Sequence, residues 1–133
     1  DLVEKKFYDG LIFHRVIDKF MIQAGGYYID NNTLFDKEAP NTIKGEFSAN
    51  GVENNLKHKL GVLSMARSDY SATGTNAITK KGYDSASCQF FIMNADNTSL
   101  DGSYAAFGKV IAGFKNIDKI VDSENVADQQ YRW

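Results

Sequence analysis

One arginine has the surroundings that a chemical role would require. Leu11 to Ile17 is rich in strand-forming residues, and side chains along a strand alternate between its two faces. Arg15 is therefore predicted to share a face with the apolar Phe13, whereas His14 points the other way and is interpreted as a core histidine. A guanidinium beside an apolar pocket could bind a carbonyl or a carboxylate. An arginine that extends its charge to water at a strand end fits the pattern equally well.

The segment from Ser87 to Asn94 predicts a second strand with a mixed face. Gln89 alternates with Phe91, which puts a side-chain amide beside an aromatic wall. Such a face could hydrogen-bond a peptide backbone and pack a ring, although a barrel strand with one wetter face shows the same pattern. Cys88, on the opposite face, has no base or metal partner in the sequence and is predicted to be a buried, unreactive thiol.

Composition excludes several other classes of function. The 133 residues are 43% apolar and 24% charged, which predicts one folded domain rather than a disordered chain. The net charge is −2 without a block of like charges, so neither a nucleic acid nor a membrane is expected as a partner. One cysteine and two histidines give no basis for a disulfide framework or a metal cluster, and no cofactor is predicted.

Short strands are the predicted elements that position these side chains. Strand-like runs cover residues 11–17, 20–23, 60–66, 88–94 and 105–111. The end of a helix is expected over residues 1–7, a long loop over 25–42 and a surface excursion over 68–87. One amphipathic helix of about three turns is predicted near the C-terminus from apolar residues at helical spacing, which are Phe114, Ile117, Ile120 and Val121. Many short strands with one clear helix favour a mainly β fold, an antiparallel sheet or barrel.

Four segments in matching order resemble the cyclophilin family of peptidyl-prolyl cis–trans isomerases. They are Phe13-His14-Arg15-Val16-Ile17, Phe20-Met21-Ile22-Gln23, Gln89-Phe90-Phe91-Ile92, and Leu100-Asp101-Gly102 with Phe107-Gly108-Lys109-Val110. The resemblance runs from about Phe7 to Ile120 and is bacterial in style. It implies an eight-stranded antiparallel barrel with two capping helices and a groove on its outside. It also implies isomerisation of X–Pro bonds in peptides and unfolded proteins, without a cofactor.

The same resemblance assigns roles to individual positions. Arg15 matches the catalytic arginine of the family. The matched substrate-binding positions are the proline-pocket walls Phe20, Met21, Phe91 and Leu100, the rim residue Tyr104, the backbone-binding Gln23 and Gln89, and the strip Ala66 and Arg67. Two alternatives stay open at this point: a non-catalytic cyclophilin-like module that binds proline-containing segments, and a β-barrel that binds small apolar ligands. The intact arginine position favours the enzyme.

Three departures from the family pattern carry expectations of their own. Ala24 stands where a backbone-permissive glycine is common. The stretch Ser68–Tyr83 is longer than the usual loop and could reshape the neighbouring specificity pocket. Ser99 stands where family members that bind cyclosporin tightly resemble one another in having a tryptophan, so weak cyclosporin binding is expected.

The ends of the chain also differ from the family pattern. Related cyclophilins have two strands and a helix before the turn at Tyr8-Asp9-Gly10, and a further strand after the second helix, whereas here Ile120 is followed by a polar stretch. A single domain over 1–133, incomplete at both ends, is therefore expected to form a partial, open-edged barrel. The missing strands would come from a longer polypeptide or from another chain. A cytoplasmic location is the default expectation.

Overall fold

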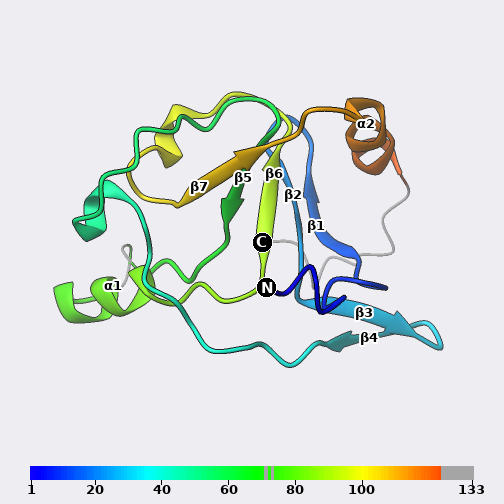
Figure 1. Ribbon diagram of the computed structural model, residues 1–133, viewed down its shortest axis with the longest axis horizontal. Coiled ribbons are helices and arrows are strands. Elements are labelled where there is room, and N and C mark those ends of the chain that lie inside the picture. The colour runs from blue at the N-terminus through cyan, green and yellow to red at the C-terminus, as the bar shows by residue number, and fades with distance from the viewer. Residues whose placement is uncertain (71, 73, 124–133) are drawn as a thin grey trace.

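The computed structural model describes residues 1–70, 72 and 74–123, and an antiparallel sheet lies at its centre (Figure 1). Five strands lie side by side in the order β1, β2, β6, β5 and β7. Their bounds are Phe13–Ile17 for β1, Met21–Ala24 for β2, Val62–Met65 for β5, Phe90–Met93 for β6 and Ala106–Lys109 for β7. The mainly β, antiparallel architecture is confirmed. The sheet is open, since none of the described strands joins β1 to β7.

A hairpin and two helices surround this sheet. Strands β3 (Tyr27–Asp30) and β4 (Thr33–Asp36) pair with each other and form a separate two-stranded sheet. Helices α1 (Asn76–Tyr83) and α2 (Phe114–Asp122) stand on opposite sides of the sheet in the view of Figure 1. Two short 3-10 turns, η1 and η2, cover Ser48–Asn50 and Thr98–Leu100. Neither described helix is long and apolar enough to cross a lipid bilayer.

The strand register sets four side chains in one row across the sheet. Arg15 of β1 pairs with Gln23 of β2, Gln23 pairs with Phe91 of β6, and Phe91 pairs with Ser64 of β5. Directly opposite residues of antiparallel strands project from the same face, so the row forms a continuous line from a cation to a buried hydroxyl. The same face carries the hydrophobic core cluster of Met21, Phe91 and Met93.

A bulge in β1 corrects one sequence expectation. The register shifts between Phe13 and Arg15, so that Phe13 pairs with Ala24 while Arg15 pairs with Gln23. Because neighbouring residues of β2 face opposite ways, Phe13 and Arg15 leave the sheet on opposite faces. The predicted shared face is therefore wrong. The apolar neighbours of Arg15 come from other strands.

Two segments assigned to loops contain regular structure. Residues 25–42, predicted as a long loop, hold the β3–β4 hairpin, whose turn places Asn31 and Asn32 at positive φ values of 48° and 62°. Two consecutive positive φ angles are typical of the hairpin turn that matches strand twist, and asparagine tolerates them. The excursion over 68–87 contains α1, whose first turn is capped by the Thr75 side chain, which accepts a hydrogen bond from the Ile78 N–H.

At the two ends of the described chain, one expectation is wrong and one is confirmed. Residues 1–7 form hydrogen-bonded turns rather than the end of a helix. Helix α2 is confirmed over Phe114–Asp122, and its buried Ile117 belongs to the face that packs against β1 and β2. The polar stretch predicted to follow it falls mostly on residues 124–133, which lie outside the described residues.

Candidate active site

A cavity of about 400 Å³ opens on the face that carries Arg15. It draws its lining from β1, β2, β6, the segment after β5, and the turn and loop before β7. The lining residues are Arg15, Phe20, Met21, Gln23, Ala66, Arg67, Asp69, Phe91, Leu100 and Tyr104. The lining therefore combines charged and polar side chains with apolar and aromatic ones.

The polar wall is a chain of three side chains. Nη1 of Arg15 donates to Oε1 of Gln23 over 3.4 Å, and Nε2 of Gln23 donates to Oε1 of Gln89 over 2.9 Å. Burial lowers the pKa of the Arg15 guanidinium, while Tyr104 acts in the opposite direction. An arginine pKa is so high to begin with that the group stays charged at neutral pH. The cavity therefore holds a fixed cation, oriented by an amide.

The apolar walls surround a space next to this cation. Phe91 and Met21 are buried at the floor, and Phe20, Leu100 and Tyr104 pack around them. The rings of Phe91 and Tyr104 meet edge to face, with centroids 5.9 Å apart. An edge-to-face pair fixes both ring planes, so the aromatic wall has a defined shape.

The Arg67 guanidinium is held by protein groups on its edges and on its faces. Nε and Nη2 donate to the Ser103 carbonyl over 3.0 and 2.9 Å, and Nη1 donates to the Ser68 carbonyl over 2.8 Å. Its carbon atom also lies 4.5 Å from the centre of the Tyr104 ring. Burial raises the pKa of the Tyr104 phenol, and the charges of Arg67 and Arg15 oppose that rise.

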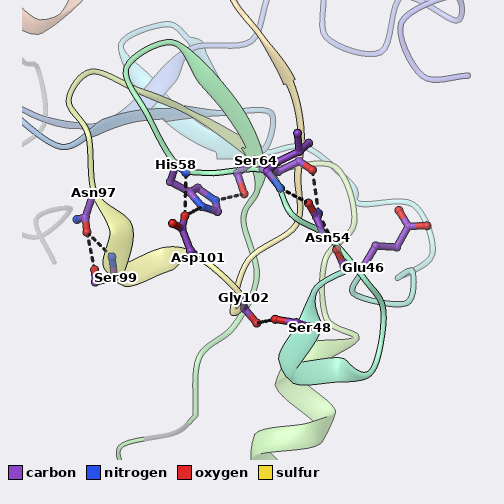
Figure 2. A network of polar contacts seen from close by, with 11 residues as sticks. Glu46, Ser48, Asn54, His58, Ser64, Asn97, Ser99, Asp101 and Gly102 are labelled. Carbon is purple, nitrogen blue, oxygen red and sulfur yellow. Dashed lines mark hydrogen bonds and ion pairs between the residues drawn. The ribbon is translucent and has the colours of Figure 1, made fainter.

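A buried hydrogen-bond chain anchors the loop that carries Leu100 (Figure 2). Nδ1 of His58 lies 2.9 Å from Oδ1 of Asp101, and Nε2 lies 2.9 Å from Oγ of Ser64. The backbone N–H of His58 donates to the same carboxylate oxygen over 2.8 Å. An ionised carboxylate only accepts, so Nδ1 carries a proton and donates a hydrogen bond to Asp101. The His58 ring also stacks on Phe91, with centroids 6.1 Å apart.

This chain has the order of a hydrolytic triad but cannot act as one. Ser64 and His58 have exposed fractions of 0% and 1%, so no substrate carbonyl reaches the hydroxyl. Burial alone would raise the pKa of the Asp101 carboxyl, but the two hydrogen bonds from His58 bring it below its usual value. The hydrogen bonds among Ser64, His58 and Asp101 therefore stabilise the loop that carries Leu100, and the His58 ring supports Phe91 from the side away from the cavity.

Comparison with known proteins identifies this arrangement. A family profile described as "Cyclophilin type peptidyl-prolyl cis-trans isomerase/CLD" matches residues 1–132. The chain belongs to the cyclophilin family. It is 39% identical over 137 residues to peptidyl-prolyl cis-trans isomerase A of Dickeya dadantii, covering 98% of this chain and 62% of that protein. It is 41% identical over 125 residues to a peptidyl-prolyl cis-trans isomerase of Acinetobacter baylyi, covering 90% and 56%. The chain thus spans about 60% of the length of these curated relatives.

Solved cyclophilin structures share the fold. A crystal structure of a cyclophilin-type isomerase from Cryptosporidium parvum is 25% identical, has a TM-score of 0.67, and is matched over 98% of this chain and 70% of its own. A second structure of that protein, determined in the presence of the dipeptide Ala-Pro, gives a TM-score of 0.66 at the same identity, over 98% of this chain and 71% of its own. The cyclophilin-like fold predicted from the sequence is therefore confirmed, as is the bacterial style of the resemblance.

The structure brings together the site residues that the resemblance assigns. All of these line the cavity except Gln89, whose side chain accepts a hydrogen bond from Gln23. The cavity also includes Asp69, which the motifs do not mark. The sequence feature that could have indicated Asp69 is its position two residues after Arg67, which the resemblance does assign to the site. His58 is a further residue that sequence reasoning assigned no role, since its partners come from distant segments.

The glycine departure is explained by the local backbone. Ala24 lies inside β2 without a positive φ, whereas Gly25 has a φ of +101° and passes so near the Cys88 carbonyl that an added Cβ would lie 2.5 Å from its oxygen. Position 25, and not position 24, therefore requires glycine in this cyclophilin. Cys88 is buried, as predicted, and burial raises the pKa of its thiol. The Tyr8 hydroxyl donates to its carbonyl over 2.9 Å.

Within residues 1–70, 72 and 74–123, no three His, Cys, Asp or Glu side chains are grouped so as to hold a metal ion. His14 is buried and its ring lies 4.4 Å from that of Tyr27. Burial, reinforced by the charge of Arg15, lowers the pKa of His14 to about 4.

Proposed function

We propose that this protein catalyses the cis–trans isomerisation of X–Pro bonds in peptides and unfolded proteins. The observation that carries the proposal is the position of the Arg15 guanidinium in a cavity that is also lined by the apolar and aromatic side chains of Phe20, Met21, Phe91 and Leu100. The names of the curated relatives support it, as does the Ala-Pro dipeptide present with the Cryptosporidium parvum structure. This chain spans only about 60% of the length of those relatives, so their activity is proposed for it and not taken over as shown.

The reaction is a rotation about the amide bond, and no covalent bond is made or broken. The barrier of about 18–20 kcal/mol arises from amide resonance, and uncatalysed X–Pro isomerisation takes tens to hundreds of seconds. In the twisted transition state the nitrogen loses its conjugation, becomes pyramidal and gains basicity. A catalyst therefore needs one hydrogen-bond donor at that nitrogen and a holder for the ring.

Arg15 is proposed as the donor. Its guanidinium can bond to the amide nitrogen or to the prolyl carbonyl, and its charge makes the bond stronger than a neutral one. A rate enhancement of about 10⁶ needs about 8 kcal/mol of differential stabilisation. One preorganised donor contributes roughly 3–4 kcal/mol of this, by analogy with oxyanion-hole donors. Desolvation and restriction of the substrate near the twisted geometry would supply the remainder.

Five of the other predicted site residues hold the substrate, or support a residue that does, in this proposal. Phe20, Met21 and Phe91 grip the prolyl ring, so that the upstream carbonyl rotates against a stationary ring. Gln23 bonds the substrate backbone and orients Arg15, and Gln89 supports Gln23. The reaction transfers no proton, so the proposal assigns no acid–base role to any residue of the cavity.

The test is a coupled isomerisation assay on a short Ala-Pro peptide. The unmodified protein should accelerate the slow phase, and Arg15→Ala should lower kcat/KM by about 30- to 1000-fold, equivalent to about 2–4 kcal/mol. Lys109→Ala, which removes an exposed cation from β7, is the matched control and should act like the unmodified protein. Full turnover by folded Arg15→Ala would overturn the mechanism.

A non-catalytic module that holds proline-containing segments is the competing function. It predicts measurable peptide binding with no acceleration of isomerisation in the unmodified protein. A binder of small apolar ligands would bind them equally well without Arg15. Weak binding of cyclosporin also belongs to the proposal, because Ser99 lies on the exposed side of η2 and is not among the cavity-lining residues.

A further inference from the structure

Arg67 lines the cavity, and three of its five N–H groups donate to backbone carbonyls of the protein. Its three nitrogen atoms each donate to a backbone carbonyl, two of them to Ser103 and one to Ser68, over 2.8 to 3.0 Å. A guanidinium donates only in its own plane, so these bonds fix the plane and leave its two faces for other contacts. The geometry suits a brace better than a substrate-binding group.

Aromatic rings from three separate segments surround this guanidinium. Its carbon atom lies 4.5 Å from the Tyr104 ring centre and 5.1 Å from the centres of Phe47 and Tyr83. Phe47 is almost completely buried, and it meets Tyr83 edge to face at 5.2 Å. A cation close to the face of an aromatic ring is attracted by the negative charge density of that face. Arg67 therefore joins the pocket rim to a second aromatic cluster outside the cavity.

One of these rings belongs to α1. Tyr83 is the last residue of that helix. Next to it, residues near the two ends of the segment 68–87 are joined by a hydrogen bond. The Ser68 N–H donates to Oγ of Ser85, and that hydroxyl donates to the Gly82 carbonyl. An added Cβ at Gly82 would lie 2.7 Å from the Ser68 carbonyl oxygen, so the two arms of the excursion touch directly. The end of α1 thus has a fixed position relative to Arg67.

On the cavity side, the contact continues to the aromatic floor. Tyr104 lies between Arg67 and Phe91, with the guanidinium on its ring and the edge-to-face contact to Phe91. Ser103, whose carbonyl receives two of the Arg67 bonds, directly precedes Tyr104 in the chain. Both the backbone and the ring at the pocket rim are therefore fixed by one side chain.

We propose that Arg67 is a positioning residue that holds Tyr104 against Phe91, sets the shape of the prolyl pocket, and couples α1 to that pocket through Tyr83. The inference rests on the proposed function for the identity of the ligand, a prolyl ring. Arg67 acts through Tyr104 and does not itself contact the substrate. A substitution in the excursion can then change activity without reaching the cavity.

The experiment is a double-mutant cycle between Arg67 and Tyr104. The dissociation constant of an Ala-Pro tetrapeptide and kcat/KM are both measured, for protein shown to be folded by circular dichroism. Arg67→Gln should weaken binding about 3- to 10-fold, and Arg67→Lys should not restore it, because an ammonium lacks the planar fork. Lys109→Gln is the matched control for loss of a cation.

The decisive comparison measures the effect of Arg67→Gln in two variants of Tyr104, one without the ring and one that keeps it. With Tyr104→Ala, Arg67→Gln should alter the dissociation constant by less than about 1.5-fold, because the two residues act as one unit. With Tyr104→Phe, which keeps the ring, the loss should return. Additive effects of Arg67→Gln and Tyr104→Ala would overturn the proposal, since they would mean that Arg67 contacts the substrate independently.

The coupling to α1 has a separate arm. Tyr83→Ala should weaken peptide binding about 2- to 5-fold, and this loss should disappear in the Arg67→Gln background. Tyr28→Ala, on the hairpin, is the control and should leave binding unchanged. Binding without turnover in the unmodified protein would defeat the proposed catalytic function, but the cycle in dissociation constants would still decide the role of Arg67.

Discussion

Arg15 and Gln23 lie opposite each other on β1 and β2, and Nη1 of the arginine donates to Oε1 of the glutamine over 3.4 Å. The other end of the Gln23 amide donates to Gln89 over 2.9 Å, which prevents the amide from turning away. An arginine has many rotamers, and fixing them costs entropy. A guanidinium already oriented by Gln23 therefore loses less freedom when the substrate binds.

Loss of this orienting amide should lower the rate without abolishing it. Gln23→Ala removes the bonds to both Arg15 and Gln89, and we expect kcat/KM to fall about 3- to 30-fold. The coupled assay on an Ala-Pro peptide measures this. Asn55→Ala removes an exposed amide bonded only to the neighbouring Glu53 among its described partners, and should leave the rate unchanged. An unaltered rate for Gln23→Ala would show that Arg15 needs no orienting partner.

Position 99 should control cyclosporin affinity. Ser99 bonds through its N–H and hydroxyl to the Asn97 side chain and offers no large apolar surface, while its neighbour Leu100 lines the cavity. Ser99→Trp adds an indole with an N–H donor, and we expect at least about a tenfold gain in affinity. Titration of isomerase activity with cyclosporin measures it, and tight, stoichiometric inhibition of the unmodified protein would contradict the idea.

The Asp101–His58 pair should contribute to stability. Asp101→Ala leaves the buried Nδ1 of His58 without its acceptor, and we expect the free energy of unfolding to fall by about 1–3 kcal/mol. Urea unfolding monitored by circular dichroism gives the value. Asp118→Ala, at an exposed position of α2, is the matched control. Equal midpoints for the two variants would mean that the chain in Figure 2 adds nothing.

His14 should make the protein sensitive to mild acid. Its folded pKa of about 4 lies below the ordinary histidine value of about 6.5, so between these pH values the unfolded chain binds a proton that the folded one does not. Its contribution is complete above pH 6.5 and is lost as the pH falls towards 4, by at most about 3 kcal/mol. His14→Gln should flatten the urea midpoint over that range. A variant with the same pH profile as the unmodified protein would assign the acid sensitivity to other groups.

Much of the sheet could be predicted because its strands carry strong local signals. The runs around Phe91 and Leu63 are apolar with strand-forming residues, and α2 repeats at the helical period. The pattern of β3 and β4 does not predict strands, because both are half polar and lie largely at the surface; the only local signal of the hairpin is the pair of asparagines at its turn. Helix α1 is short and weakly amphipathic, so its pattern resembles that of a polar loop. The bulge in β1 has no local sequence signal.

The cavity-lining positions were recognised from motifs, not from periodicity. Alternation alone put Arg15 beside Phe13, which the bulge makes wrong. The contacts of Arg67 with Ser103 and of His58 with Asp101 each join residues more than thirty positions apart, and only the folded chain brings them together. The roles of the individual residues, the cytoplasmic location and the incomplete ends stay predictions.

The position of β1 at the edge of the sheet separates activity from global stability. Among the described strands, β1 hydrogen-bonds to β2 alone, whereas β2, β6 and β5, which carry the pocket floor, each have two neighbours. Strands with one neighbour open at lower free energy than the interior of a sheet. Amide hydrogens around Arg15 should therefore exchange with solvent before those around Phe91. Local opening of β1 can then move the Arg15 guanidinium out of the pocket and stop the proposed turnover. The melting temperature, which reports global unfolding, would not change.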